Sequence, residues 1–160
     1  MAADFLLELD GIKGESKDDA HPDTIEVASY SFGAVNAGAS ATGSGGGSGK
    51  VAFHDMKFVA PISVASPELM LACASGKHID KATLYVRKQG ADDQQEFKTI
   101  VMEDVIVSSY NSTGSDKGAQ DYFTLNFTTI SFEYKPQNDD QTLGSAVKTG
   151  WNVKKNAKHG

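Results

Sequence analysis

Apolar and polar residues alternate along much of the chain, and this period of two predicts β-strands. The first alternating run, Phe5 to Leu9, precedes a polar, turn-rich connection at residues 11–22. The acidic pair Glu103–Asp104 indicates a bend within the later run at residues 97–110. Further runs lie at residues 25–32, 51–59, 82–86, 97–110 and 123–134, and Trp151 with Val153 fits a last short strand.

The phase of the alternation changes inside two of these runs. Apolar residues at 25–27 share one parity and those at 30–32 the other, and residues 123–134 contain a similar change. An extra residue in a β-bulge reverses the faces of all later side chains, so we expect a bulge at each change. The first change places Ser29 and Ser31 on the face opposite the two neighbouring aromatic rings.

One segment departs from this pattern and predicts a single short helix. Ser66, Pro67 and Glu68 make a favourable start, because serine accepts hydrogen bonds from free amides and proline needs no donor there. Gly76 is expected to end the helix in the left-handed conformation. Mainly β patterning with one helix predicts a β-barrel, or two curled antiparallel sheets, with one flanking short α-helix. The expected apolar face of the helix comprises Leu69, Met70, Ala72 and Cys73.

Two segments predict long loops. Residues 37–50 are rich in glycine and serine, which have little side chain to bury and many backbone states to lose, so this loop is expected to be flexible. Residues 111–121 carry a second cluster of turn-forming residues. Both loops lie between strand candidates, so residues 1–160 are interpreted as one domain.

Composition narrows the functional classes. The net charge is −6, with 15 basic and 21 acidic residues, which argues against nucleic-acid binding. Cys73 is the only cysteine, so no intrachain disulfide is expected and a reducing cytoplasm suits the folding of the chain. The start of the chain lacks the pattern of a cleaved signal peptide, and no apolar run reaches the ~20 residues of a membrane span.

Candidate catalytic and ligand-binding motifs are weak. Before Gly49–Lys50 the P-loop pattern needs a glycine where Ser44 stands, and Val51 replaces the serine or threonine that should follow. The histidines have no recognised metal-ligand spacing, and no nucleophile elbow is present. We therefore expect no enzyme activity, no metal and no cofactor.

Five short motifs occur in the order found in the haemolysin-coregulated protein (Hcp) family of bacterial type VI secretion, and the chain resembles that family over nearly its whole length. Two longer segments, residues 66–78 and 125–137, resemble the family's helix and its long C-terminal strand. The motifs are D-G-I-K-G-E-S (Asp10–Ser16), A-S-G-K-H (Ala74–His78), D-V-I-V-S-S-Y (Asp104–Tyr110), Y-K-P-Q (Tyr134–Gln137) and G-W-N (Gly150–Asn152).

The resemblance implies a structural subunit and not an enzyme. Members of this family form hexameric rings with a wide lumen, and the rings stack into a tube that a contractile sheath propels and a spike protein caps. The tube carries effector proteins, and some rings hold an effector in the lumen before firing. The resemblance thus implies a cytoplasmic protein that is later secreted without a cleaved signal peptide.

Within this framework, the candidate site residues fall into two groups. Ser31 and its same-face neighbour Ser29 are the candidates for a lumen surface that contacts effectors. The glycine-rich segment is the candidate for ring stacking, because a flexible loop can order against the next ring. Its glycines are Gly43, Gly45, Gly46, Gly47 and Gly49.

Two alternatives remain open. A small-ligand or carbohydrate-binding β-barrel would have the same strand pattern but would not need a large homo-oligomer. The second alternative is an enzymatic effector, which would be expected to carry a further domain after the barrel. The native mass of the purified protein distinguishes the ring-forming subunit from the ligand-binding barrel.

Overall fold

The computed structural model describes residues 3–36, 50–90 and 92–160, and within them the chain is mainly β with one helix. The elements are β1 (Asp4–Leu9), β2 (Ile25–Val27), β3 (Ser29–Ser31), β4 (Ala34–Asn36), β5 (Val51–Phe53), β6 (Met56–Pro61), α1 (Ala65–Ser75), β7 (Ile79–Gln89), β8 (Gln94–Ser115), β9 (Gly118–Asn126), β10 (Thr129–Tyr134), β11 (Val147–Asn152) and β12 (Ala157–Lys158).

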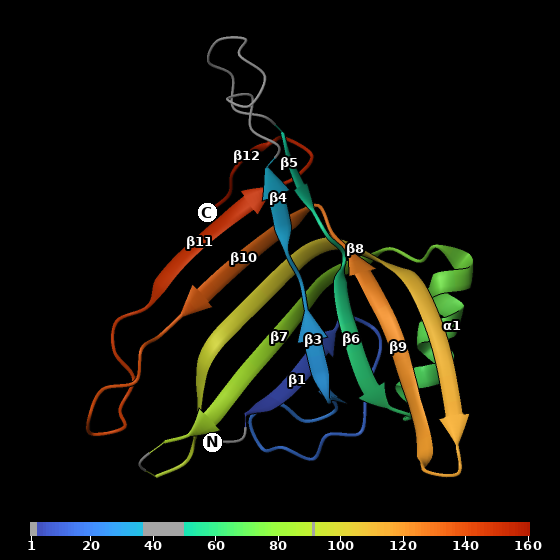
Figure 1. The fold of residues 1–160 in the computed structure, drawn as a ribbon, viewed down its shortest axis with the longest axis horizontal. Helices are drawn as coiled ribbons and strands as arrows, with labels where there is room; N and C mark the ends of the chain where they lie inside the picture. Colours follow the sequence, from blue (N-terminus) through green and yellow to red (C-terminus); the bar gives the residue numbers. More distant parts are fainter. Residues whose placement is uncertain (1–2, 37–49, 91) are drawn as a thin grey trace.

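The antiparallel strands form a closed barrel with an extension on one side (Figure 1). Going round the barrel, β2 pairs with β1, β1 with β7, β7 with β8, β8 with β9, β9 with β6 and β6 with β3. Since β3 follows β2 after a single residue, Ala28, the circuit closes, and the Ala28 N–H donates to the Val59 carbonyl at 2.7 Å. β10, β11 and β12 extend the sheet beyond the barrel, which confirms the predicted fold class.

The long strand β8 joins the barrel to this extension. Its first half pairs with β7 and β10, and its second half pairs with β9. At Asp104, between the halves, φ is 58°, a left-handed conformation at the position where the acidic pair predicts a bend. One strand thus contributes to both halves of the molecule.

Both predicted bulges are wrong, because each phase change marks a break between two strands. Residues 25–27 belong to β2 and pair with β1, whereas residues 29–31 belong to β3 and pair with β6. Likewise β9 ends at Asn126 and β10 begins at Thr129. A chain that leaves one sheet and enters another reverses its inward face as a bulge does, so the alternation alone does not distinguish them.

The predicted loop at residues 111–121 is also wrong. β8 runs to Ser115 and β9 starts at Gly118, so only a tight turn separates them. Residues 111–120 are all exposed, which explains their polar composition. Hydrogen bonds between the two strands hold this hairpin in β conformation, and its own sequence carries no apolar alternation that would reveal it.

Helix α1 lies against the outside of the barrel (Figure 1), and in the described residues no helix has the length and hydrophobicity to cross a membrane. Gly76 ends it with φ 65°, as predicted. It begins one residue before Ser66, its N-cap residue is Val64, which makes no side-chain cap hydrogen bond, and the Ala65 N–H donates to Ser63 Oγ at 3.1 Å. The predicted apolar face is correct at Leu69 and Ala72 and wrong at Met70, whose side chain is exposed.

The core lies inside the barrel. Phe58 on β6 and Phe123 on β9 are cross-strand partners whose rings stack with centroids 5.2 Å apart, and both are fully buried. The other large buried side chains come from strands throughout the barrel and from α1, and they include Leu7, Ile25, Met56, Leu69, Ile79, Leu84, Ile100, Met102 and Leu125.

Candidate functional site

The two serines predicted to share a face lie on the barrel exterior. Ser29 and Ser31 on β3 are both exposed, whereas Tyr30 between them is half-buried against the core. Phe5 contacts the Tyr30 ring edge-on, with centroids 5.2 Å apart, which holds the tyrosine inward. Strand alternation therefore turns both serine hydroxyls away from the core.

The serine face continues across the neighbouring strands. Opposite Ser31 lies Lys57 on β6, and the register continues through Thr124 on β9 to Ser109 on β8. A β-bulge between Val107 and Ser109 brings two adjacent hydroxyls to Thr124, whose Oγ1 lies 2.7 Å from Ser108 Oγ and 2.6 Å from Ser109 Oγ. No local sequence pattern predicts this cluster, because only the register of distant strands brings its members together.

The chemistry of this outer surface, which we call the hydroxyl face, suits reversible protein contact. Around Ser31 its described side chains are mostly small hydroxyls, with Lys57 as a cation and Asp55 at one end, whereas the cross-strand row of Ser29 continues through Val59 and Tyr122. Asp55 accepts hydrogen bonds from Ser108 Oγ at 2.6 Å and from Asn126 Nδ2 at 2.8 Å, so its charge is already partnered. Such a surface offers hydrogen bonds without a strong field of either sign.

The glycines predicted to act in stacking, Gly43 to Gly49, lie outside the described residues. On either side of them the chain forms a two-stranded antiparallel hairpin, in which Asn36 pairs with Val51 and Ala34 with Phe53. His54, directly after β5, donates its N–H to the Gly33 carbonyl at 2.8 Å and so extends the pairing.

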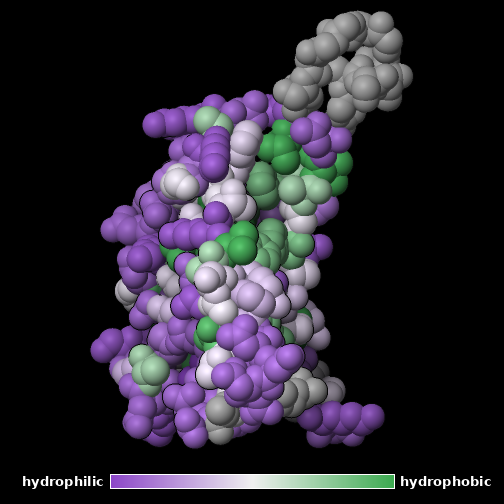
Figure 2. All heavy atoms as spheres, turned by 90° about the vertical axis from the view of Figure 1, so that its left-hand side faces the viewer, coloured by the Kyte–Doolittle hydropathy of each residue, from purple (hydrophilic) through white to green (hydrophobic). Residues whose placement is uncertain are grey.

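An apolar groove of about 520 Å³ opens between this hairpin and the β10–β11 extension. The indole Nε1 of Trp151 is buried there without a hydrogen-bond partner in the described part of the chain. Figure 2 views the molecule from the side of β10 and β11, where the surface is largely hydrophilic and the largest group of apolar residues lies at the upper right. The apolar lining comprises Phe32, Val51, Phe53, Ile130, Phe132 and Trp151.

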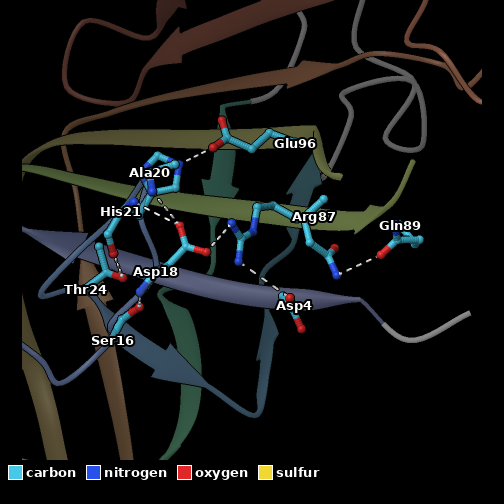
Figure 3. Close-up of polar contacts among 10 residues, drawn as sticks. Asp4, Ser16, Asp18, Ala20, His21, Thr24, Arg87, Gln89 and Glu96 are labelled. Carbon is cyan, nitrogen blue, oxygen red and sulfur yellow. Dashed lines mark hydrogen bonds and ion pairs between the residues drawn. The ribbon is translucent and has the colours of Figure 1, made fainter. Parts of the chain in front are cut away.

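A polar network fastens the β1–β2 connection onto the barrel (Figure 3). Arg87 on β7, whose side chain is 9% exposed, donates from Nη1 to Asp18 Oδ2 at 2.7 Å, with Asp4 a further 3.6 Å ion-pair partner. The Arg87 hydrogen bond holds the pKa of Asp18 below its ordinary value of 3.8. His21 stacks on Tyr85, with ring centroids 3.8 Å apart, and its Nε2 contacts the Glu96 carboxylate.

Tyr85, the ring on which His21 stacks, is partly buried and lies beside the Glu8 carboxylate. Burial raises its pKa to about 12, and the neighbouring Glu8 carboxylate, which accepts the Tyr85 hydroxyl at 3.1 Å, adds to the shift. This tyrosine is therefore neutral at physiological pH and provides a flat ring against which His21 packs.

A second buried charge ties α1 to the barrel. Asp121 on β9 is 1% exposed and accepts hydrogen bonds from the Ser66 hydroxyl and, at 2.7 Å, from the Tyr110 hydroxyl. Burial first, and then this hydrogen bond, raises the pKa of Tyr110. These groups are saturated by one another, which is typical of a structural network.

The remaining histidines do not converge on a metal site. His78 contacts Asp104, and its Nδ1 lies 3.8 Å from Asp80, but no cluster of three metal-ligating side chains occurs among residues 3–36, 50–90 and 92–160. Cys73 is a free, half-buried thiol at the edge of the core.

The fold and these surfaces define a class, a small antiparallel β-barrel with a flanking helix, a hydroxyl face and an apolar groove. The chain belongs to the Hcp family of type VI secretion: residues 6–134 match the family model described as "Type VI secretion system effector, Hcp". The match includes both serines of β3 and the whole of α1.

Individual relatives agree with this assignment. The chain is 40% identical over 161 residues to "Protein hcp1" of Pseudomonas aeruginosa, and the alignment covers 98% of each. Among solved structures, Hcp1 from Salmonella typhimurium is 33% identical with a TM-score of 0.83, covering 99% of this chain and 100% of that one. A structure titled "Structure of a type six secretion system protein" is 28% identical with a TM-score of 0.90 and the same coverage.

Proposed function

We propose that this protein is the tube subunit of a type VI secretion system, forming hexameric rings that stack and are expelled with effector proteins. Family membership is the observation that carries the proposal. In this role the subunit works with a contractile sheath and a spike protein, resides in the cytoplasm before firing and is then secreted.

The exposed surfaces of the subunit support assembly. In the described sheets β12 pairs only with β11, and β4 and β5 pair only with each other, so these strands have open edges. Open edges favour association with another chain unless they are covered. A closed ring covers such surfaces with neighbouring copies of the same subunit.

The hydroxyl face is proposed to line the lumen, with Ser29 and Ser31 contacting cargo. Its small hydroxyls offer hydrogen bonds to a protein surface, and its few charged groups include the already partnered Asp55. Contacts of this kind retain a cargo protein yet allow its release, since a neutral hydrogen bond contributes about 1 kcal/mol.

The first test is the native mass of the purified protein, with negative-stain images of the same fraction. Open rings with six times the subunit mass are the expected result. A monomer over a wide concentration range would contradict the proposal and favour a ligand-binding barrel, for which the apolar groove would be the site.

Ring stacking has a separate test. Deleting Gly43 to Gly49 is expected to weaken the stacking of rings while single rings still form. Loss of the ring itself would show that this segment acts within the ring and not between rings.

A further inference from the structure

The helix α1 is apolar on the side that faces away from the barrel. Leu69 and Ala72 bury the inner side, yet Val64, Met70 and Leu71 are 59%, 56% and 56% exposed. At 100° per residue, Val64 and Leu71 lie almost directly in line, and Pro67 and Ala74 lie beside them. We call these five residues the helix face. A helix that is hydrophobic all round is normally buried, so this face calls for a partner.

The groove described above is the complementary surface. Its apolar lining side chains are half-buried, apart from the buried Ile130, and the buried Trp151 Nε1 lacks a partner in the described residues. Buried donors without a hydrogen-bond partner are rare in folded proteins. An acceptor on a bound partner can supply the missing hydrogen bond.

The charges around the two surfaces have opposite signs. Beside the helix face, Glu68 and Glu15 are exposed, and Glu15 accepts from the Val64 N–H at 3.3 Å. Three further exposed acids, Glu8, Asp10 and Asp23, line the adjoining hollow together with Val64 and Glu68, and Lys13 is the one cation in that lining, so this rim is mainly acidic. At the groove, exposed lysines stand next to lining residues on two segments: Lys50 beside Val51, and Lys154 with Lys155 before Asn156.

We propose that the helix face of one copy binds in the groove of a second copy, with the acidic and basic rims facing each other. The occupant is another copy of this chain because the chain itself supplies both apolar surfaces and both signs of charge. This inference rests on the proposed ring and names the contact that builds it.

The helix face and the groove lie on different sides of the subunit, and this determines the symmetry of an assembly built from their contact. α1 lies on one side of the barrel and β10 to β12 on the other (Figure 1). Two different surfaces on opposite sides of a subunit make a heterologous contact, which repeats from copy to copy and closes into a ring when the rotation permits. A contact between two helix faces would instead stop at a dimer.

Cysteine cross-linking tests the contact directly. In a Cys73→Ala background, Leu71→Cys places a thiol on the helix face and Thr149→Cys places one at the groove, and both parent residues are exposed. A short bismaleimide should convert the double variant into a ladder ending at the closed ring. Mixing the two single variants should give only dimers, and neither alone should cross-link.

A matched control combines Leu71→Cys with Thr113→Cys, which sits on the exposed β8–β9 hairpin. No ladder is expected from it. Intact rings without a Leu71–Thr149 cross-link would overturn this inference and leave the tube proposal standing. Dimers from Leu71→Cys alone would also overturn it, and a monomeric parent protein would remove the ring proposal itself.

Charge reversal gives an independent test. Glu68→Lys and the pair Lys154→Glu with Lys155→Glu should each weaken assembly about tenfold, and combining all three should recover most of the loss. Trp151 is the only tryptophan, so its fluorescence should report groove occupancy as rings dissociate on dilution. Unchanged assembly in the single-sided variants, or no rescue in the combination, would refute the pairing of the rims.

Discussion

Ser66, in the first turn of α1, donates its hydroxyl proton to the buried carboxylate of Asp121 on β9. The contact crosses 55 positions of sequence and fixes the helix to the barrel wall. It also fixes how the helix face is presented, because the helix cannot rotate without breaking a hydrogen bond to a buried charge.

Replacing Asp121 with alanine should lower the free energy of unfolding by about 3 kcal/mol, because the buried Ser66 hydroxyl and the half-buried Tyr110 hydroxyl lose their acceptor. Urea unfolding at pH 7 measures this. Tyr122→Phe is the control, since that exposed hydroxyl only donates to Gln120 at 3.2 Å and its loss should change stability by under about 0.5 kcal/mol. Equal effects in the two variants would contradict a structural role for Asp121.

Asp18→Asn should lower stability by about 2 kcal/mol at pH 7, a value between those of exposed and buried ion pairs. Because the pKa of Asp18 is lower in the folded state than its ordinary 3.8, its contribution is complete above that value and is lost as pH falls through the lowered pKa.

The stability difference between Asp18→Asn and the wild type should therefore shrink in urea unfolding below about pH 4. Asp19→Asn, a change at the exposed neighbouring residue, should show little difference at either pH. If the stability difference between the wild type and Asp18→Asn stays constant with pH, the Asp18–Arg87 ion pair is not the source of that difference.

Gly150→Ala should destabilise the C-terminal extension. A Cβ added at Gly150 would lie 2.6 Å from the His159 carbonyl oxygen and 3.0 Å from that of Ile130, so β11 or β12 must shift, at about 1–3 kcal/mol. Thermal unfolding measures the loss. In Gly114→Ala the new Cβ meets only Ala119 Cβ at 3.9 Å, and this control should unfold like the wild type.

Ser31→Glu should reduce effector retention about tenfold while leaving ring formation unchanged, because it adds a bulky charge to the proposed lumen face. Co-purification of an effector with the ring, at matched ring concentration, is the measurement. Ser145→Glu adds the same charge in the exposed β10–β11 connection and should retain effector normally. Normal retention by Ser31→Glu would count against the hydroxyl face as the lumen.

Sequence patterns predicted those parts of the fold that depend on neighbouring residues. Alternation marked most strands, Gly76 marked the end of α1, and strand parity placed Ser29 and Ser31 on one outward face. Each of these is a local property, since side chains alternate along any strand and glycine adopts the left-handed conformation in any helix cap.

Contacts between distant segments decided the rest. The hairpin at residues 111–121 is a strand pair because β8 and β9 bond each other, and the phase changes are strand breaks because β2 and β3 have different partners. The hydroxyl face depends on the register of four strands, and the groove brings Phe53 to Trp151. By itself the sequence determined which residues face in or out along each strand, whereas only the tertiary structure decided which strands meet, because pairing energy depends on partners that local patterns do not specify.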